Sequence, residues 1–271
     1  MQRVKIVLFV AVFAIVGLMP GTALASSPGE PVGPVDVAVV AGHVADSPVK
    51  PLPDGPSDPI QLSLHTTIAS DYRFRGTSYS QGEPVAQATV IAAHESGLFG
   101  GVFVSTLGNH DIYGAVEADL FVGWATAIAP AVTAEVILYY YYYPDANPAV
   151  PNTDSFDTAV QLTGDFGAFA PKVGVWYSWA QAALGGRDNL YLFGDLVWRI
   201  PGIPIEAKVH AGYTDGAYSI SADRTTVDWS AGITFKAADN IRLGLEYVGM
   251  GGPKVTDFTD DTVVASLSMN F

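Results

Sequence analysis

The sequence predicts an all-β protein, a transmembrane antiparallel β-barrel of about twelve strands over residues 61–271. Three patterns predict this fold. Apolar and polar side chains alternate along repeated segments, the connections between segments alternate between long and short, and aromatic residues collect at the ends of one face. Alternation with period two gives each strand two unlike faces. In a membrane barrel one face contacts lipid and the other lines the interior.

Composition narrows the class of protein further. The chain has 271 residues, of which 49% are hydrophobic and 15% charged, and its formal net charge is −14. After the N-terminus no apolar run is long enough for a membrane-spanning helix, so the apolar residues are spread over strands. The acidic balance argues against nucleic acid as a partner, because nucleic acid binding needs a cationic surface. The absence of cysteine excludes disulfides, cysteine nucleophiles and thiolate metal sites.

Two segments precede the predicted barrel. In residues 1–25, Arg3 and Lys5 stand before an apolar run at 6–19 and a small-residue cleavage site that ends at Ala25. This order predicts a secretory signal peptide, with a membrane anchor as the alternative. Residues 26–60 hold eight of the 18 prolines, which disfavour regular structure. We expect a disordered periplasmic segment there, either a simple spacer or an attachment to another envelope component.

The expected strands are near the roughly 9–11 residues that cross a bilayer at a tilt. They cover residues 61–75, 84–94, 98–107, 115–126, 131–143, 154–163, 171–179, 189–200, 204–214, 225–236, 240–248 and 261–271. The connections after odd-numbered strands are mostly the longer ones. Outer-membrane barrels have short periplasmic turns and longer external loops. An even strand count places the N- and C-termini of the barrel region on the periplasmic side.

Aromatic side chains on the apolar face form two belts, as expected where amphipathic rings prefer the two membrane interfaces. Strands that run outward end in Tyr72 and Phe74, Tyr140 and Tyr142, Tyr177 and Trp179, Tyr213, and Tyr247. Strands that run back end in Trp124, Trp198, Phe235 and Phe271. The tyrosine run at 139–143 is expected to belong to the outer belt, with ligand stacking as the alternative.

Two short motifs near the start of the barrel region resemble a known family. Ser-Asp-Tyr-Arg-Phe-Arg-Gly stands at 70–76, and a Glu-Ser-Gly turn at 95–97 precedes Leu-Phe-Gly-Gly-Val-Phe. These motifs resemble the TorF-like porins of proteobacteria over residues 61–107, whereas the Pro-rich segment and the tyrosine run depart from that pattern. The resemblance implies an outer-membrane porin of a Gram-negative bacterium. The last strand, which ends in Phe271, also resembles the signal that the barrel assembly machinery recognises.

Charged residues of the strands share the polar parity, which supports the barrel because charges at membrane depth are tolerated only inside. The residues expected to line the pore are Asp71, Arg73, Arg75, Glu117, Asp119, Glu135, Lys208, Arg242 and Glu246. Arg73, Arg75, Glu117 and Asp119 are the candidates for the constriction. Inward acids outnumber inward bases by nine to six. They either pair and fill the interior, or they line a wet constriction with a weak preference for cations.

The expected function is passive diffusion of small polar solutes or ions, with outer-membrane lipid as the surroundings. The alternatives are a non-conducting structural or adhesive barrel and, less favoured, a soluble periplasmic β-sandwich or a barrel enzyme. The five histidines lack the His-Glu-x-x-His spacing and no Gly-x-Ser-x-Gly motif occurs. No catalytic residue, cofactor or metal site is therefore predicted. The acidic residues Asp257, Asp260 and Asp261 are better explained as solvated loop charges than as a cation site.

Overall fold

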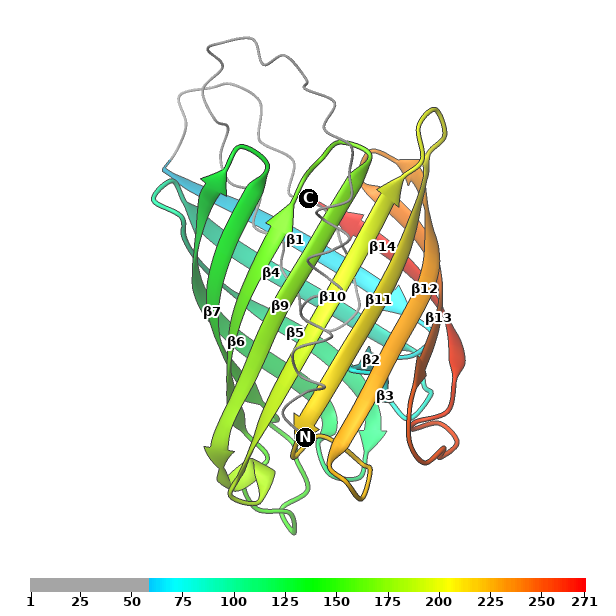
Figure 1. Cartoon of the computed structure of the whole chain (residues 1–271). Helices are drawn as coiled ribbons and strands as arrows, with labels where there is room; N and C mark the ends of the chain where they lie inside the picture. Colours follow the sequence, from blue (N-terminus) through cyan, green and yellow to red (C-terminus); the bar gives the residue numbers. More distant parts are fainter. Residues whose placement is uncertain (1–58) are drawn as a thin grey trace. The chain divides into compact units, whose positions relative to one another are not determined.

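The computed structural model describes residues 59–271, where twelve strands close into an antiparallel barrel (Figure 1). The barrel strands are β1 (Ile60–Ala69), β4 (Val85–His94), β5 (Leu98–His110), β6 (Gly114–Ala129), β7 (Val132–Tyr142), β8 (Ser155–Gly164), β9 (Phe169–Gln181), β10 (Arg187–Arg199), β11 (Ile205–Gly216), β12 (Thr225–Ala238), β13 (Ile241–Met250) and β14 (Thr262–Asn270). The predicted all-β barrel of twelve strands is confirmed. The predicted signal peptide and Pro-rich segment lie outside the described residues, apart from residues 59 and 60.

Strands that follow each other in the chain pair with each other, and β1 closes the sheet against β14. The closing register sets Ile68 opposite Leu267, and His65 opposite Asn270. One end of the barrel carries short turns and both ends of the described chain, and we name it the turn end. The other end, the loop end, carries the longer connections at 70–84, 143–154, 217–224 and 251–261. Within the described residues no helix is long and apolar enough to cross a membrane.

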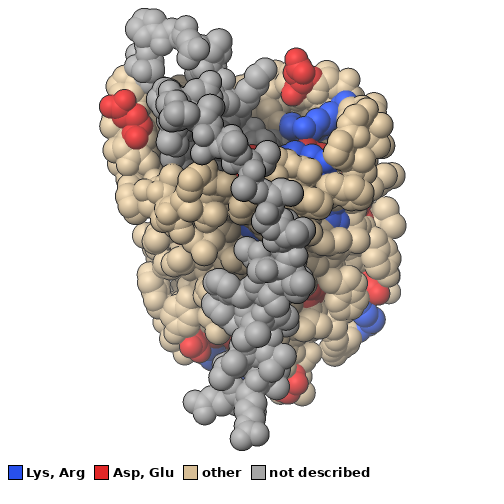
Figure 2. Space-filling view, turned by 45° about the horizontal axis from the view of Figure 1, so that its top comes forward, with Lys and Arg blue, Asp and Glu red and all other residues tan. Residues whose placement is uncertain are grey.

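The predicted division between an apolar outer face and a polar inner face is seen along β6. Leu120, Val122 and Trp124 are about half exposed. Glu117 and Asp119, which lie nearer the loop end of the same strand, are each 1% exposed. The same alternation recurs on β7, β12 and β13. On the outer surface that Figure 2 shows, most side chains are uncharged, and acidic and basic groups gather toward the two ends. This distribution suits a wall surrounded by lipid.

The aromatic belts are present on the outer face, with corrections at the first strand and in the run at 139–143, where Tyr139, Tyr141 and Tyr143 are buried. Trp124, Trp198 and Phe235 are exposed near the turn end, and Tyr142 and Tyr247 near the loop end. Tyr72 and Phe74, which the sequence pattern assigned to the loop-end belt, lie inside the barrel instead. β1 ends at Ala69, and Tyr72 is 2% exposed. The alternation continues beyond Ala69 in the sequence, but the chain there has left the wall.

The inner face is bulky on one side of the barrel. On β5, β6, β9 and β10, aromatic rings lie across glycines of the neighbouring strand, as Phe99 does over Gly123 and Phe193 over Gly174. A Cβ atom at Gly123 would come within 2.5 Å of the Phe99 ring. Glycine therefore allows each ring to lie flat against the wall, an arrangement known to support strand glycines.

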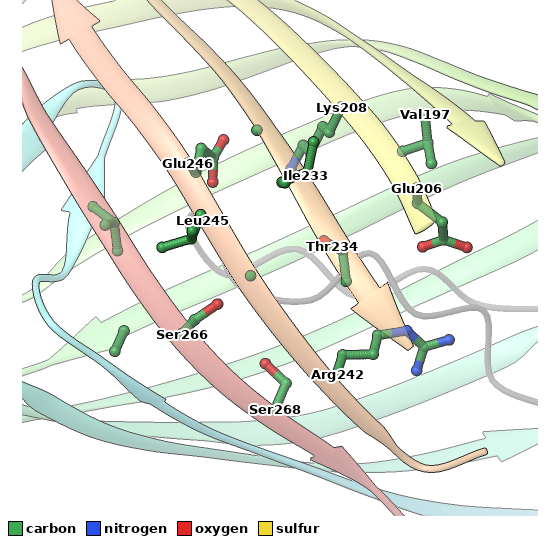
Figure 3. Close-up of a pocket in the computed structure, with 14 residues that line it drawn as sticks. Val197, Glu206, Lys208, Ile233, Thr234, Arg242, Leu245, Glu246, Ser266 and Ser268 are labelled. Atoms are coloured by element: carbon green, nitrogen blue, oxygen red, sulfur yellow. The ribbon is translucent and has the colours of Figure 1, made fainter. Parts of the chain in front are cut away.

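The opposite side of the interior is lined by smaller and more polar side chains. On β12, β13 and β14 these include Gly232, Gly244, Ser266 and Ser268. Figure 3 shows these strands around a pocket near the turn end, with Glu206, Lys208, Arg242 and Glu246 contributing charged groups. The smaller side chains of this wall leave room for that pocket.

Candidate pore constriction

Residues 70–84 connect β1 to β4 through the barrel interior, and we name this segment the inner hairpin. It contains the short strands β2 (Arg73–Phe74) and β3 (Thr77–Ser78), which pair with each other. Arg75 and Gly76 form the turn between them, with φ angles of 52° and 80°. Two consecutive positive φ angles define a type I′ turn, for which a glycine at the second position is favoured. A two-residue turn of this type makes a compact hairpin that fits inside a barrel.

Asp71 holds the base of the inner hairpin. Its Oδ1 atom accepts hydrogen bonds from the hydroxyls of Ser78 at 2.6 Å and Ser80 at 2.9 Å. Its Oδ2 atom forms a buried ion pair with the guanidinium of Arg73. Ser80 also accepts a hydrogen bond from the backbone N–H of Tyr72. One buried carboxylate therefore connects both arms of the hairpin, and its charge is compensated locally.

Arg73 fastens the inner hairpin to the loop at 251–261. Its Nη1 atom donates to the carbonyl oxygen of Asp260 at 2.8 Å, and to those of Gly76 and Phe258 at longer distances. The backbone N–H of Ser78 donates to the carbonyl oxygen of Phe258 at 2.8 Å. The side chain of Arg73 is 2% exposed. Its several donors are largely used in holding two loop-end segments together.

Arg75 reaches from the tip of the hairpin to the far wall. Its Nη2 atom lies 3.1 Å from Oδ2 of Asp157 on β8, and both side chains are buried. Four aromatic rings surround the guanidinium, and we name them the Arg75 cage. Their centroids lie from its Cζ atom at 4.6 Å (Phe74), 4.6 Å (Tyr191), 5.1 Å (Tyr218) and 5.5 Å (Trp176).

The tip also approaches the wall formed by β12 and β13. A Cβ atom at Gly76 would lie 2.7 Å from Cβ of Met250 and 3.0 Å from Cβ of Asp228. The hairpin therefore starts at β1, contacts β12 and β13 at Gly76, and pairs with β8 through Arg75. It crosses the interior and is the candidate for the constriction of the barrel.

Glu117 and Asp119 lie on β6 with their side chains directed inward. The hydroxyl of Tyr143 donates to Oε1 of Glu117 at 2.9 Å. Neither carboxylate oxygen of Asp119 accepts a hydrogen bond from a described residue. Asp119 interacts electrostatically with Glu117 and with Asp157, the partner of Arg75. The structure thus brings three buried carboxylates into one neighbourhood with a single guanidinium.

The remaining predicted pore residues lie elsewhere in the interior. Lys208, Arg242 and Glu246 line the pocket of about 80 Å³ near the turn end (Figure 3). Glu246 accepts a hydrogen bond from the hydroxyl of Ser230. Glu135 on β7 accepts one from the side-chain amide of Gln161 on β8. All nine predicted residues face the interior, and five of them lie on the hairpin or on β6.

A larger cavity of about 610 Å³ opens above the hairpin at the loop end, and we name it the vestibule. Aromatic side chains form much of its lining: Phe74, Tyr79, Tyr113, Tyr218 and Phe258. Arg75 forms part of its floor, and Asp111 and Asp257 contribute acidic groups. The interior is therefore divided by the hairpin into a wide vestibule and a smaller pocket toward the turn end.

Sequence reasoning missed several residues of this interior. Trp176 and Tyr191 of the Arg75 cage stand on the inward parity of their strands, so the period-two pattern could have identified them. Tyr218 belongs to a loop, and no local pattern indicates that it faces Arg75. His210, Asp195 and Asp228 are expected on the inward face from parity, and they form a second buried group in which His210 on β11 lies 2.8 Å from Asp195 and 3.0 Å from Asp228. It ties β10, β11 and β12 together on the inner face.

The loop acids do not form a metal centre in the described part of the chain. No group of three or more His, Asp and Glu side chains within residues 59–271 is arranged to hold a metal ion. Asp260 is occupied by Arg73, and Asp261 pairs with Lys254. The Lys254 ammonium lowers the pKa of the Asp261 carboxyl below its usual value by hydrogen bonding. These charges fasten the loop at 251–261.

Comparison with known proteins assigns the family. The model of a family described as a bacterial protein of unknown function (Gcw_chp) matches residues 53–271. The chain belongs to the Gcw_chp family. No curated protein matches the sequence of this Gcw_chp protein.

Solved structures show which fold this Gcw_chp protein has. The NanC porin aligns with a TM-score of 0.52 and 10% identity, over 78% of this chain and 98% of NanC. The KdgM porin, in a complex with disordered oligogalacturonate, aligns with a TM-score of 0.51 and 5% identity, over 78% of this chain and 97% of KdgM. The shared fold is that of outer-membrane porin barrels.

Proposed function

We propose that this Gcw_chp protein is a porin-like channel of the outer membrane of a Gram-negative bacterium, through which small polar solutes or ions diffuse passively. The observation that carries the proposal is the interior of the barrel. A vestibule at one end and a charged pocket toward the other are separated by a constriction of ionisable side chains. An apolar outer face surrounds this polar interior, as a pore in a bilayer requires. No catalytic activity is part of the proposal.

The proposed location rests on the ends of the chain. Residues 1–25 would act as a signal peptide and residues 26–60 as a periplasmic segment, with the turn end of the barrel in the periplasm. Phe271 would present the terminal strand to the barrel assembly machinery. The motifs at 70–76 and 95–97 support a relation of this chain to the TorF-like porins.

The proposed roles of the pore residues follow from their positions. Asp71 and Arg73 hold the inner hairpin, while Arg75, Glu117 and Asp119 set the charge at the narrowest level. Glu135, Lys208, Arg242 and Glu246 line the path toward the periplasm. At the constriction, the three carboxylates exceed the single guanidinium of Arg75. This excess supports a preference for cations, because fixed charge of one sign selects permeant ions of the other.

The alternative is a barrel that does not conduct and has a structural or adhesive role. Two observations favour it: the ion pair between Arg75 and Asp157 crosses the interior, and aromatic rings fill much of one inner wall. The two functions differ in one measurable property, the passage of ions.

The deciding experiment is single-channel recording in planar bilayers under a salt gradient, with protein purified from the outer membrane of a Gram-negative host. We expect discrete openings and a reversal potential on the cation side. The double substitution Glu117→Gln and Asp119→Asn should move the reversal potential toward zero. Asp165→Asn, which removes an exposed carboxylate of the turn end, is the matched control and should leave it unchanged. A folded, heat-modifiable barrel that never conducts would refute the channel and support the alternative.

A further inference from the structure

We infer that the Arg75 cage is a binding site for organic cations that carry a guanidinium or amine group, and that Arg75 is its built-in occupant. A solute of this class would take the place of Arg75 as it passes from the vestibule to the constriction. The inference names the solute class of the proposed channel and in that respect rests on the proposed function. The binding site itself can be tested without conduction.

The cage has the chemistry of a cation site. Phe74, Trp176, Tyr191 and Tyr218 place their rings within 5.5 Å of the guanidinium carbon, and Asp157 supplies one carboxylate at 3.1 Å. Cations are attracted to the faces of aromatic rings, and more strongly where water is excluded. The four rings come from separate parts of the chain, namely the hairpin, β9, β10 and the loop at 217–224. Together with Asp157 they enclose a flat cation.

Arg75 is held much less firmly than its neighbour Arg73. Arg73 donates to three carbonyl oxygens and pairs with Asp71 and Asp260. Arg75 pairs with Asp157 through Nη2, and its Nε and Nη1 atoms have no hydrogen-bond partner among the described residues. The guanidinium of Arg75 thus depends on a single carboxylate and on ring faces. A solute cation could make the same interactions with Asp157 and the rings. Replacement of the Arg75 guanidinium by such a cation would therefore lose no contact that the solute does not restore.

The vestibule gives a solute access to this site. Phe74 and Tyr218 of the cage also line the vestibule, as does the enclosed Arg75, so the two spaces are continuous. The volume of about 610 Å³ lies within the range of about 300–1,000 Å³ that is common for small-molecule sites. Asp111 and Asp257 add negative charge to the vestibule. A small organic cation would therefore meet carboxylates before it reaches the rings.

The surrounding charge favours a cation over an anion. Asp119 is 1% exposed, and its carboxylate oxygens have no hydrogen-bond partner among residues 59–271. Glu117 and Asp157 lie close enough to Asp119 to interact with it electrostatically. A second cation near Arg75 would be attracted by Asp157, the carboxylate that pairs with Arg75, whereas an anion drawn to Arg75 would be repelled by it.

Arg75→Asn is the variant that opens the site. It removes the resident cation and retains the turn, because asparagine followed by glycine is a preferred sequence for a type I′ turn. We would titrate the full-length protein in detergent with guanidinium chloride in the low millimolar range, at constant ionic strength with sodium chloride. Trp176 fluorescence reports on the cage, and Trp176→Phe in the same background shows which part of the signal is specific.

We expect the Arg75→Asn protein to respond at a guanidinium concentration at least tenfold lower than the wild type. Adding Asp157→Asn to this variant should remove the response. Equal responses of Arg75→Asn and wild type, or a response that survives in the Asp157→Asn double variant, would overturn the inference. So would a wild-type response to sodium acetate that guanidinium does not produce, because it would assign the site to anions. If Arg75→Asn does not migrate as a folded barrel, Arg75→Ala serves as the second variant under the same criteria.

Conductance separates this inference from the proposed function. Binding of guanidinium by a barrel that never conducts would refute the channel and retain the cation site. Conduction without any guanidinium response in Arg75→Asn would retain the channel and refute the cation site. Where both hold, guanidinium should block the potassium current of Arg75→Asn and leave that of the Asp157→Asn double variant unchanged.

Discussion

Adjacent tyrosines in one strand have opposite surroundings in this barrel. Tyr142 is 42% exposed on the outer face, whereas Tyr139 is 1% exposed and stacks on Trp176 with ring centroids 4.7 Å apart. The expected outer belt is therefore right for Tyr140 and Tyr142 and wrong for Tyr139, Tyr141 and Tyr143. Parity alone decides between them, because successive side chains of a strand point to opposite faces.

Tyr139→Ala tests this difference against Tyr142→Ala on the same strand. Removal of the buried ring leaves a cavity beside Trp176, and we expect the free energy of unfolding to fall by about 3–5 kcal/mol. Tyr142→Ala should lower it less, since its ring does not fill the interior. Guanidinium-induced unfolding in lipid vesicles, followed by gel migration, measures both variants. Equal losses would contradict the assigned faces.

At the scale of elements, the inner hairpin is an excursion from a wall that is complete without it. β1 and β4 pair along all ten residues of each strand, from Ile60 opposite His94 to Ala69 opposite Val85. No residue of the hairpin takes part in this ladder. The hairpin should therefore control passage through the barrel without being needed to close it.

Replacing residues 73–78 by a glycine-serine linker tests this separation. The linker lacks Arg73 and Arg75, so the segment loses its contacts with the loop at 251–261 and with β8. We expect the barrel to remain heat-modifiable and the single-channel conductance to increase several-fold. The same replacement of residues 147–149, which are exposed in another loop, is the control and should change neither property. Unchanged conductance in the hairpin variant would show that the hairpin is not the constriction.

At the scale of the whole molecule, the distribution of apolar and ionisable side chains in the barrel is the reverse of that in a soluble protein. Large apolar side chains cover its outer wall, while its buried ionisable groups line the interior. A soluble β-sandwich would bury that apolar face, so the reading of the sequence as a soluble protein is not supported. The closed sheet leaves no unpaired edge among the described strands. A β-structure in lipid must be closed in this way, because an open edge would leave backbone groups without hydrogen bonds.

Leu245→Arg tests the assignment of the outer wall to lipid. Leu245 is 52% exposed near the middle of β13, and a charge at this depth should lower the free energy of unfolding in a bilayer by about 2–4 kcal/mol. Thr234→Arg, on the inner face of the neighbouring strand, is the matched control and should lower it much less. Refolding into vesicles with urea titration measures both. A larger loss for Thr234→Arg would reverse the assigned faces.

The sequence by itself determined the number of strands, the face of each side chain within the wall and the two ends of the barrel. These features depend on period-two alternation and on turn residues, which act over a few neighbouring positions. The path of residues 70–84 was decided only by the tertiary structure. Arg75 pairs with Asp157, which is 82 positions away in the sequence. Arg73 bonds to Asp260, which is 187 positions away. The alternation of apolar and polar side chains after Ala69 resembles that of a wall strand. The local pattern therefore could not distinguish a segment inside the barrel from a strand of its wall. Closure of the barrel brings these distant partners together, and the buried charges are compensated only when the hairpin lies inside.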